Sequence, residues 1–186
     1  MTVSDGIRLL TEWRIDKFRD PDNRISKLLR AGLSIPEAIR LFGDAYLGSE
    51  TTHGNIAVHE GLYLLTGIIT GIDGASAKWD SSNAYLGVGN SSQAAVDEDT
   101  GLVGASKTYK AMDGTYPQRA ASESAEDQYT EWRSTFGSSD ANYDWQEYTV
   151  SNSNSDSGKN LNRKVESKGT KSSGESWTLS LKITFA

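Results

Sequence analysis

Large apolar residues alternate with smaller polar ones over the last stretch of the chain. Such alternation, with a period of two, predicts a β-strand that turns one face toward a core. The apolar set consists of Trp177, Leu179, Leu181, Ile183 and Phe185. At about 1.5–3 kcal/mol for each fully buried side chain, this strand is expected to contribute strongly to folding, with Phe185 in the core. The strand either lies within its own sheet or completes the sheet of a neighbouring subunit.

Shorter runs of the same kind precede this strand and alternate with polar loops. We expect strands over residues 84–89, 107–112, 128–136, 141–152 and 161–167. Short strands joined by polar turns, rather than by helical patterns, indicate antiparallel sheets that pack face to face. The sequence therefore predicts an α+β protein that is mainly β, built on an antiparallel, jelly-roll-like β-sandwich.

The first third of the chain shows helical spacing instead. An apolar stripe that includes Trp13 and Phe18 predicts a helix that starts near Ser4 and Asp5 and ends before "DPDN" at 20–23. The next stretch, "RISKLLRAG", predicts a short helix that Gly32 terminates.

The tetrapeptide "SIPE" then predicts the start of another helix. Ser34 is suited to the N-cap position and Glu37 lies three residues later, which together form a capping box. Pro36 fits the first helical turn, where a missing N–H costs nothing. Residues 1–53 are therefore expected to form a helical N-terminal segment.

The segment 54–71 is apolar on nearly every face. Such a run is either a buried helix or two strands, and its length favours a helix. Gly61 and Gly67 each lower helix stability by about 1 kcal/mol, so we expect another backbone to pack closely there. Residues 54–186 are then expected to form a β-sandwich domain led by this buried helix.

The chain is acidic overall, but its charge is uneven. Its 19 basic and 25 acidic residues leave a net charge of −6, which does not favour nucleic-acid binding. Residues 73–147 carry 5 basic and 13 acidic side chains, whereas residues 148–186 carry 6 and 3. We expect the basic end to meet the acidic loops of this chain or of a neighbouring one. The basic side chains of this end that we expect to make the contact are Arg163, Lys164, Lys168 and Lys171.

Several cellular contexts are disfavoured by the same composition. Without cysteine, the chain has no disulfide framework and no Cys-ligated zinc. The start, "MTVSDGIRLL", lacks the basic and apolar regions of a secretory signal, so we expect folding in a cytoplasm. The longest apolar stretch is too short to span a bilayer, and no membrane association is expected.

Motifs for catalysis are lacking. His53 and His59 are six residues apart, not the four that would place both on one helical face. Gly87 and Gly89 lack the third glycine of a dinucleotide fingerprint. We therefore expect no enzymatic activity, no cofactor and no metal site.

Two weaker possibilities remain open at this stage. The carboxylates of the loops 96–101 and 138–147 could bind a structural cation. Trp132, Trp145 and Tyr148 could form a carbohydrate-binding face, although packing inside the protein is the more usual role of such residues.

Several motifs taken together resemble a family of tailed-bacteriophage virion structural proteins. They are "GNIAVHEGLYLLTGIITG", "SSNAYLGVGNSSQAA", "KTYKAMDGTYPQR", "STFGSSDANYDWQEYTV" and "LNRKVESKGTKSSGESWTLSLKITF". The resemblance covers residues 54–186 and implies a virion structural protein with a β-sandwich body. Residues 1–53 lie outside it.

The resemblance implies a role in assembly. The first expectation is a capsid decoration (cement) protein that stabilises the shell as a symmetric homo-oligomer, a trimer or another ring. The alternatives are a tail, neck or baseplate component, or a glycan- or receptor-binding module of a fibre. The partners would be other virion proteins, such as the major capsid protein, after synthesis in the cytoplasm of a host bacterium.

The N-terminal segment is the candidate for docking. Its apolar residues pack either under the sandwich or on a partner protein. The candidate docking residues are Trp13, Phe18, Leu28, Leu29, Ile39 and Phe42.

Overall fold

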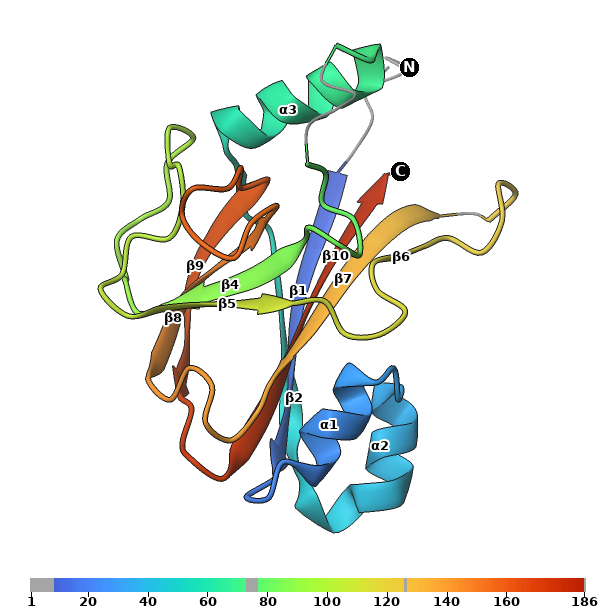
Figure 1. Ribbon diagram of the computed structural model, residues 1–186, viewed down its shortest axis with the longest axis vertical. Helices are drawn as coiled ribbons and strands as arrows, with labels where there is room; N and C mark the ends of the chain where they lie inside the picture. Colours follow the sequence, from blue (N-terminus) through green and yellow to red (C-terminus); the bar gives the residue numbers. More distant parts are fainter. Residues whose placement is uncertain (1–8, 73–76, 126, 186) are drawn as a thin grey trace, which may run out of the picture.

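The computed structural model describes residues 9–72, 77–125 and 127–185. Two antiparallel five-stranded sheets face each other (Figure 1). The first sheet has the order β2 (Tyr46–His53), β1 (Leu9–Arg19), β10 (Glu175–Phe185), β7 (Gln128–Phe136) and β6 (Gln118–Arg119). The second has the order β3 (Ile56–Ala57), β9 (Asn162–Thr170), β8 (Asp144–Ser151), β4 (Tyr85–Gly89) and β5 (Lys107–Ala111). The predicted mainly β sandwich is therefore confirmed.

The last strand lies within its own sheet. β10 pairs with β1 on one side and with β7 on the other, so the chain itself completes this sheet. Trp177, Leu179, Leu181 and Ile183 are buried, as predicted. Phe185 is 43% exposed, so its predicted place in the core is wrong. Phe185 lies at the end of the strand and lines a groove at the edge of the core.

The predicted helix over the N-terminal stripe is wrong, because residues 9–19 form β1. Trp13 and Ile15 point into the core between the sheets, whereas Phe18 packs on the opposite face of the strand. A strand covered on both faces is apolar at odd and even positions, which hides its period of two. The expected helix start at Ser4 and Asp5 lies outside the described residues.

The core between the sheets is centred on aromatic side chains. The ring of Trp145 lies 4.9 Å from that of Phe136 and 4.9 Å from that of Trp177, both edge-to-face. Trp13 and Tyr148 extend this group toward β1. Edge-to-face pairs contribute about 0.5–1.5 kcal/mol each beyond their buried area, so this cluster stabilises the contact between the sheets.

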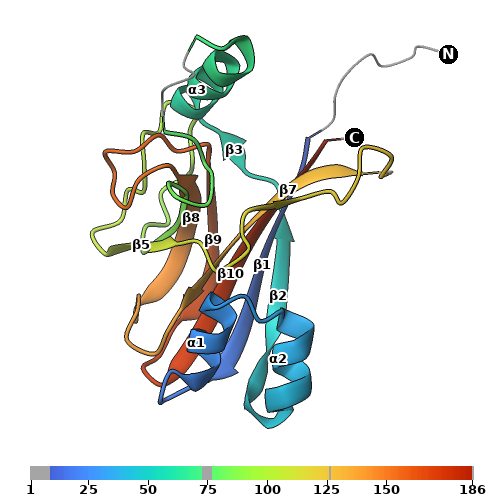
Figure 2. The same ribbon diagram turned by 45° about the vertical axis from the view of Figure 1, so that its right-hand side comes forward.

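Two helices cover one end of the first sheet on its outer face, α1 (Arg24–Arg30) and α2 (Ile35–Phe42), followed by the short turn η1 (Gly43–Ala45) (Figures 1 and 2). Both were predicted. Their buried side chains, Ile25, Leu29 and Ala38, form a second core with Phe18. Residues 46–53, also assigned to the helical segment by the prediction, instead form β2.

The helix ends form by the expected local contacts. The side chain of Ser34 accepts a hydrogen bond from the backbone N–H of Glu37, and the carboxylate of Glu37 accepts from the N–H of Ser34. This is the predicted capping box. Gly32 follows α1 with a φ of 104°, a left-handed conformation that glycine adopts without strain. The carboxylate of Asp20 accepts hydrogen bonds from the first turn of α1, at Ile25 N (2.9 Å) and Ser26 N (2.8 Å).

The predicted helix in segment 54–71 is present as α3 (His59–Thr70). Only one side of it is buried, through Gly61, Leu64 and Gly67, so the prediction of a fully buried helix is wrong. A Cβ atom on Gly61 would lie 2.5 Å from the Cα of Leu161. This confirms that another backbone packs closely at that glycine.

An ion-pair network joins the acidic and basic parts of the chain. The buried guanidinium of Arg163 lies 2.8 Å from both Asp99 and Glu147. The predicted contact between the basic end and the acidic loops is thus confirmed at Arg163. Lys168 pairs instead with Glu166, and Lys171 donates to the carbonyl oxygen of Gly137.

Candidate functional site

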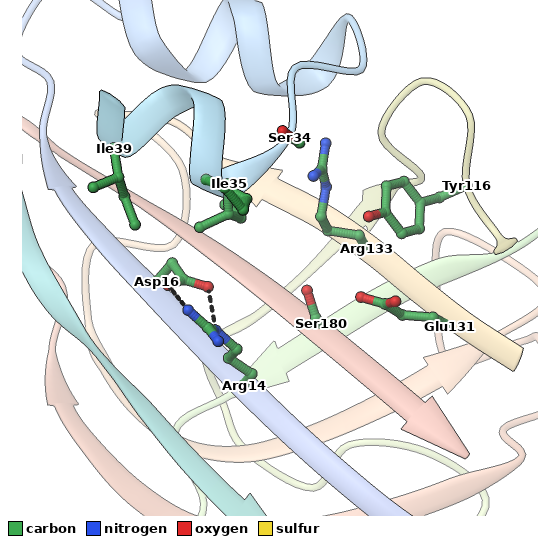
Figure 3. Close-up of a pocket in the computed structure, with 10 residues that line it drawn as sticks. Arg14, Asp16, Ser34, Ile35, Ile39, Tyr116, Glu131, Arg133 and Ser180 are labelled. Carbon is green, nitrogen blue, oxygen red and sulfur yellow. Dashed lines mark hydrogen bonds and ion pairs between the residues drawn. The ribbon is translucent and has the colours of Figure 1, made fainter. Parts of the chain in front are cut away.

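A pocket lies on the outer face of the first sheet, beside α2 (Figure 3). The strand register places Arg14 on β1, Ser180 on β10 and Arg133 on β7 side by side. Because serine is small, a hollow remains above it between the two arginines. The pocket has a volume of about 470 Å³, and Ile35 and Ile39 of α2 form its apolar wall.

Arg14 is held by a carboxylate on its own strand. Its Nε and Nη2 atoms each donate to Asp16 at 2.8 Å, a bidentate arrangement. Tyr46 also donates to Asp16, at 2.9 Å. The hydrogen bonds with Asp16 raise the pKa of Arg14 above its usual value. The charge of Arg14 is therefore already compensated.

Arg133, at the other side of the pocket, is buried and is held by several hydrogen bonds. Its Nε donates to Asp113 at 3.0 Å, and its Nη2 donates to the carbonyl oxygens of Leu29 (3.0 Å) and Leu33 (2.9 Å). The guanidinium lies 4.4 Å from the ring centroid of Tyr116. This arginine joins the α1–α2 turn to the sheet, which is a structural role.

Glu131 differs from the other charged residues of the pocket. Among the described residues, its carboxylate has no hydrogen bond and no ion pair within 4.0 Å, although Arg133, Lys182 and Arg14 act on its charge from farther away. Its cross-strand neighbour Lys182 places Nζ 4.3 Å from the ring centroid of Tyr129 instead. The side chain of Glu131 is half-buried, and burial raises the pKa of its carboxyl group. Glu131 is thus free to accept a donor from outside the chain.

The pocket does not assemble a recognisable catalytic set. The two arginines are engaged by Asp16 and Asp113, which leaves Glu131 as the lining carboxylate without a hydrogen bond among the described residues. His59, on α3, pairs with Asp97 at 3.2 Å, and His53 lies on β2. Within residues 9–72, 77–125 and 127–185, no group of three or more His, Cys, Asp or Glu side chains could hold a metal ion.

A second surface of interest lies at the end of the sandwich opposite α1 and α2. There α3 lies on one side of a groove, and the start of β1 and the end of β10 lie on the other (Figures 1 and 2). The exposed large apolar residues of these elements and of β3 and the turn after α3 are Leu9, Leu10, Ile56, Leu62, Tyr63, Ile69, Ile72 and Phe185. We call this surface the apolar end.

A groove of about 330 Å³ enters the sandwich at the apolar end. Leu62 and Leu65 of α3 form one wall, Phe185 contributes to the other, and Trp132 lies between the sheets. On α3, Tyr63 is 76% exposed, and Ile72 in the turn after it is 82% exposed. The helix therefore presents apolar side chains both to the groove and away from it.

The residues predicted to dock a partner lie mostly inside the chain. Trp13 belongs to the core between the sheets, and Phe18 and Leu29 belong to the second core. Ile39 and Phe42 pack against the second core and are partly buried. Leu28 is 39% exposed and is the member of this set that a partner could reach most readily.

The apolar segment 54–71 carries the sequence signal for the apolar end. A segment that is apolar all round predicts a buried helix, whereas in the structure one side packs on the protein and the other is exposed. The free carboxylate of Glu131 had no signal in the sequence, because its isolation depends on where Lys182 and Tyr129 lie.

The structure bears on both weaker possibilities, the carbohydrate-binding face and the cation site. Trp132, Trp145 and Tyr148 are buried, so these three residues do not form a carbohydrate-binding face. Asp99 pairs with Arg163, and Asp140 accepts from both Arg30 and Lys110 at 2.7 Å. These carboxylates of the two acidic loops are thus compensated by basic side chains.

Compared with known proteins, the chain gives no significant match to a family model, a curated protein or a solved structure. Among the described residues, no helix is both long and apolar enough to cross a membrane. A functional assignment therefore depends on the exposed surfaces and on the sequence motifs.

Proposed function

We propose that this chain is a structural protein of a tailed-bacteriophage virion, and specifically a capsid decoration protein that assembles as a symmetric homo-oligomer. The observation that carries the proposal is the apolar end, where eight large apolar side chains are exposed on neighbouring elements. The motif resemblance over residues 54–186 supports the same role. The proposed partners are the major capsid protein and further copies of this chain.

The apolar end favours permanent association over an independent monomer. Soluble monomers rarely expose large contiguous apolar patches, and such patches usually mark an interface. Full burial of side chains such as Tyr63, Ile69 and Ile72 would stabilise an assembly by about 1.5–3 kcal/mol each before the costs of association. This surface suits attachment to a shell that stays assembled.

Buried ion pairs in the sandwich suit a protein that keeps one rigid shape. Buried ion pairs, at Arg163 with Glu147 and at Arg133 with Asp113, connect loops and helices to both sheets. Such pairs define the positions of the segments they join, and losing one partner is costly. A decoration protein requires this kind of rigid body and needs no active site.

The copy number in purified virions tests the proposal. We expect the protein in virions on the order of hundreds of copies, since a decoration protein repeats with the shell lattice. About a dozen copies would instead support a neck, tail or baseplate ring, which is the alternative assignment. Absence of the protein from purified virions would overturn both assignments.

Binding to undecorated shells tests the surface itself. We expect Ile69→Glu, at the apolar end, to abolish the binding of recombinant protein to shells. Leu41→Glu is the matched control, because Leu41 is also an exposed apolar residue of a helix but lies on α2, at the other end. If Leu41→Glu abolished binding and Ile69→Glu did not, docking would instead lie on the N-terminal helices.

A further inference from the structure

We propose that the pocket beside α2 binds a cationic side chain, lysine or arginine, of a partner protein, with its alkyl stem along α2 and its charged head on Glu131. The inference is independent of the virion role, because it rests on the charges and shape of the pocket alone. Figure 3 shows Glu131 and Ser180 on the sheet side, with Ile35 and Ile39 opposite.

The hydrogen bonds of the pocket leave one carboxylate, that of Glu131, available to a cation. Arg14 is neutralised by Asp16 and Arg133 by Asp113, each in direct hydrogen-bonded contact. Glu131 is the lining carboxylate that lacks such a contact among the described residues, although Arg133, Lys182 and Arg14 act on its charge from farther away. A hydrogen bond between two charged groups is stronger than a neutral one, and a half-buried site screens it less than water does.

The shape of the pocket selects a cation on an apolar stem. Ile35, Pro36 and Ile39 line the side formed by α2, and Ser180 leaves space on the side of the sheet. Lysine and arginine bury their methylene groups along apolar surface while the charged head reaches a polar partner. The volume of about 470 Å³ lies in the range of ligand sites and admits such a side chain with part of its backbone.

Other ligand classes fit less well. An anion would meet the free carboxylate of Glu131 and two arginines that are already paired. A hard metal ion requires several oxygen ligands, but Asp16 already accepts three hydrogen bonds, two from Arg14 and one from Tyr46. One free carboxylate suffices for an ammonium or guanidinium group.

The burial of Glu131 also favours a cationic ligand. Removal from water disfavours the ionised form of Glu131 and raises the pKa of its carboxyl group, and Glu12 adds to this effect, whereas Arg133, Lys182 and Arg14 oppose it. A bound cation would reverse part of this effect and stabilise the carboxylate. Binding of the cation should therefore lower the pKa of Glu131, and norleucine, which carries no charge on its side chain, should not.

Nuclear magnetic resonance on the isotopically labelled full chain tests the proposal. The probes are the Nα-acetyl N-methylamides of lysine, arginine and norleucine, the last having the alkyl stem without the charge. We expect saturable shifts at Glu131, Ser180 and Ile35 with the lysine or arginine derivative, and binding at least about tenfold weaker for norleucine. The side-chain carboxyl signal of Glu131 should also titrate at lower pH with the cationic probe present.

Two variants provide the controls. Glu131→Gln keeps the shape of the side chain and should abolish binding. Glu98→Gln should leave it unchanged, because Glu98 is an exposed residue of the loop between β4 and β5 and does not line the pocket. Equal binding of norleucine, unchanged binding by Glu131→Gln, or no saturable shift with either cationic probe would overturn the proposal. Much tighter binding of the free diamine cadaverine would assign the site to a polyamine and overturn the side-chain assignment.

Discussion

The guanidinium of Arg163 lies 2.8 Å from the carboxylate of Glu147, and both side chains are buried. Glu147 also accepts hydrogen bonds from the N–H groups of Val103 (3.0 Å) and Gly104 (2.7 Å), in the loop between β4 and β5. Arg163 reaches Asp99 in the same loop. One residue pair, on β8 and β9, thus positions a long acidic loop that has little secondary structure of its own.

Loss of this arginine should be costly. Arg163→Leu leaves the charge of Glu147 buried without its partner, so we expect a loss of about 3–5 kcal/mol in the free energy of unfolding. Urea denaturation at pH 7 measures it. Lys159→Ala is the control, because Lys159 pairs with Glu60 at the surface and should change stability by less than about 1 kcal/mol. Equal effects of the two substitutions would contradict the structural role of Arg163.

A methyl group at Gly61 should disturb the contact between α3 and the second sheet. Its Cβ would lie 2.5 Å from the Cα of Leu161, a backbone atom that cannot move aside cheaply. We expect Gly61→Ala to lower stability by about 1–3 kcal/mol in thermal or urea unfolding, despite the better helix propensity of alanine.

Gly43→Ala is the matched control for this substitution. Gly43 has no atom within 4 Å of the position of its Cβ, and it follows α2 with a right-handed φ of −53°. The control should be neutral or raise stability slightly, because alanine reduces the freedom of the unfolded chain. If Gly61→Ala behaved in the same way, the close approach of α3 would be incorrect.

The buried Lys171 should make the free energy of unfolding depend on pH in the alkaline range. Burial lowers the pKa of its ammonium group from 10.5 to about 8. Between these values the unfolded chain binds more protons than the folded chain, so the stability of the folded state rises as pH increases. We expect the difference in unfolding free energy between wild type and Lys171→Met to shift in favour of wild type by up to about 3 kcal/mol from pH 8 to pH 10.5. A constant difference across this range would contradict the lowered pKa.

Trp145→Ala should destabilise the core between the two sheets. The indole is buried against Phe136 and Trp177, and its Nε1 donates to the carbonyl oxygen of Ala141 at 3.0 Å. We expect a loss of about 3–5 kcal/mol in urea denaturation. Tyr63→Ala, at an exposed position of α3, should change stability by less than about 0.5 kcal/mol. A Trp145→Ala variant as stable as wild type would contradict the packing of the core.

Features that depend on neighbouring residues in the sequence were predictable. The capping box of Ser34 and Glu37 forms within four residues, and Gly32 ends α1 through its own backbone conformation. The alternation along β10 needs only a core on one side. These contacts are short in sequence, so the same residues favour the same structure in most surroundings.

The candidate sites could not be predicted in the same way. Glu131 is unpaired because Lys182 lies over the ring of Tyr129, which is a matter of side-chain placement across strands. Leu41 and Ile69 are exposed because nothing in the described part of the chain covers them, although their sequence surroundings resemble those of buried residues. Periodicity shows which face of an element is apolar, but it does not show what lies against that face.

The amino-acid sequence by itself determined the mainly β class, the approximate positions of most strands, and the caps of α1 and α2. Only the tertiary structure decided that residues 9–19 form a strand, that α3 is half exposed, and that Glu131 lies free in a pocket. The physical reason is the range of the interactions involved. Propensity and capping act over a few residues, whereas β1 is defined by pairing with β10, more than 150 residues away, and by packing on both of its faces.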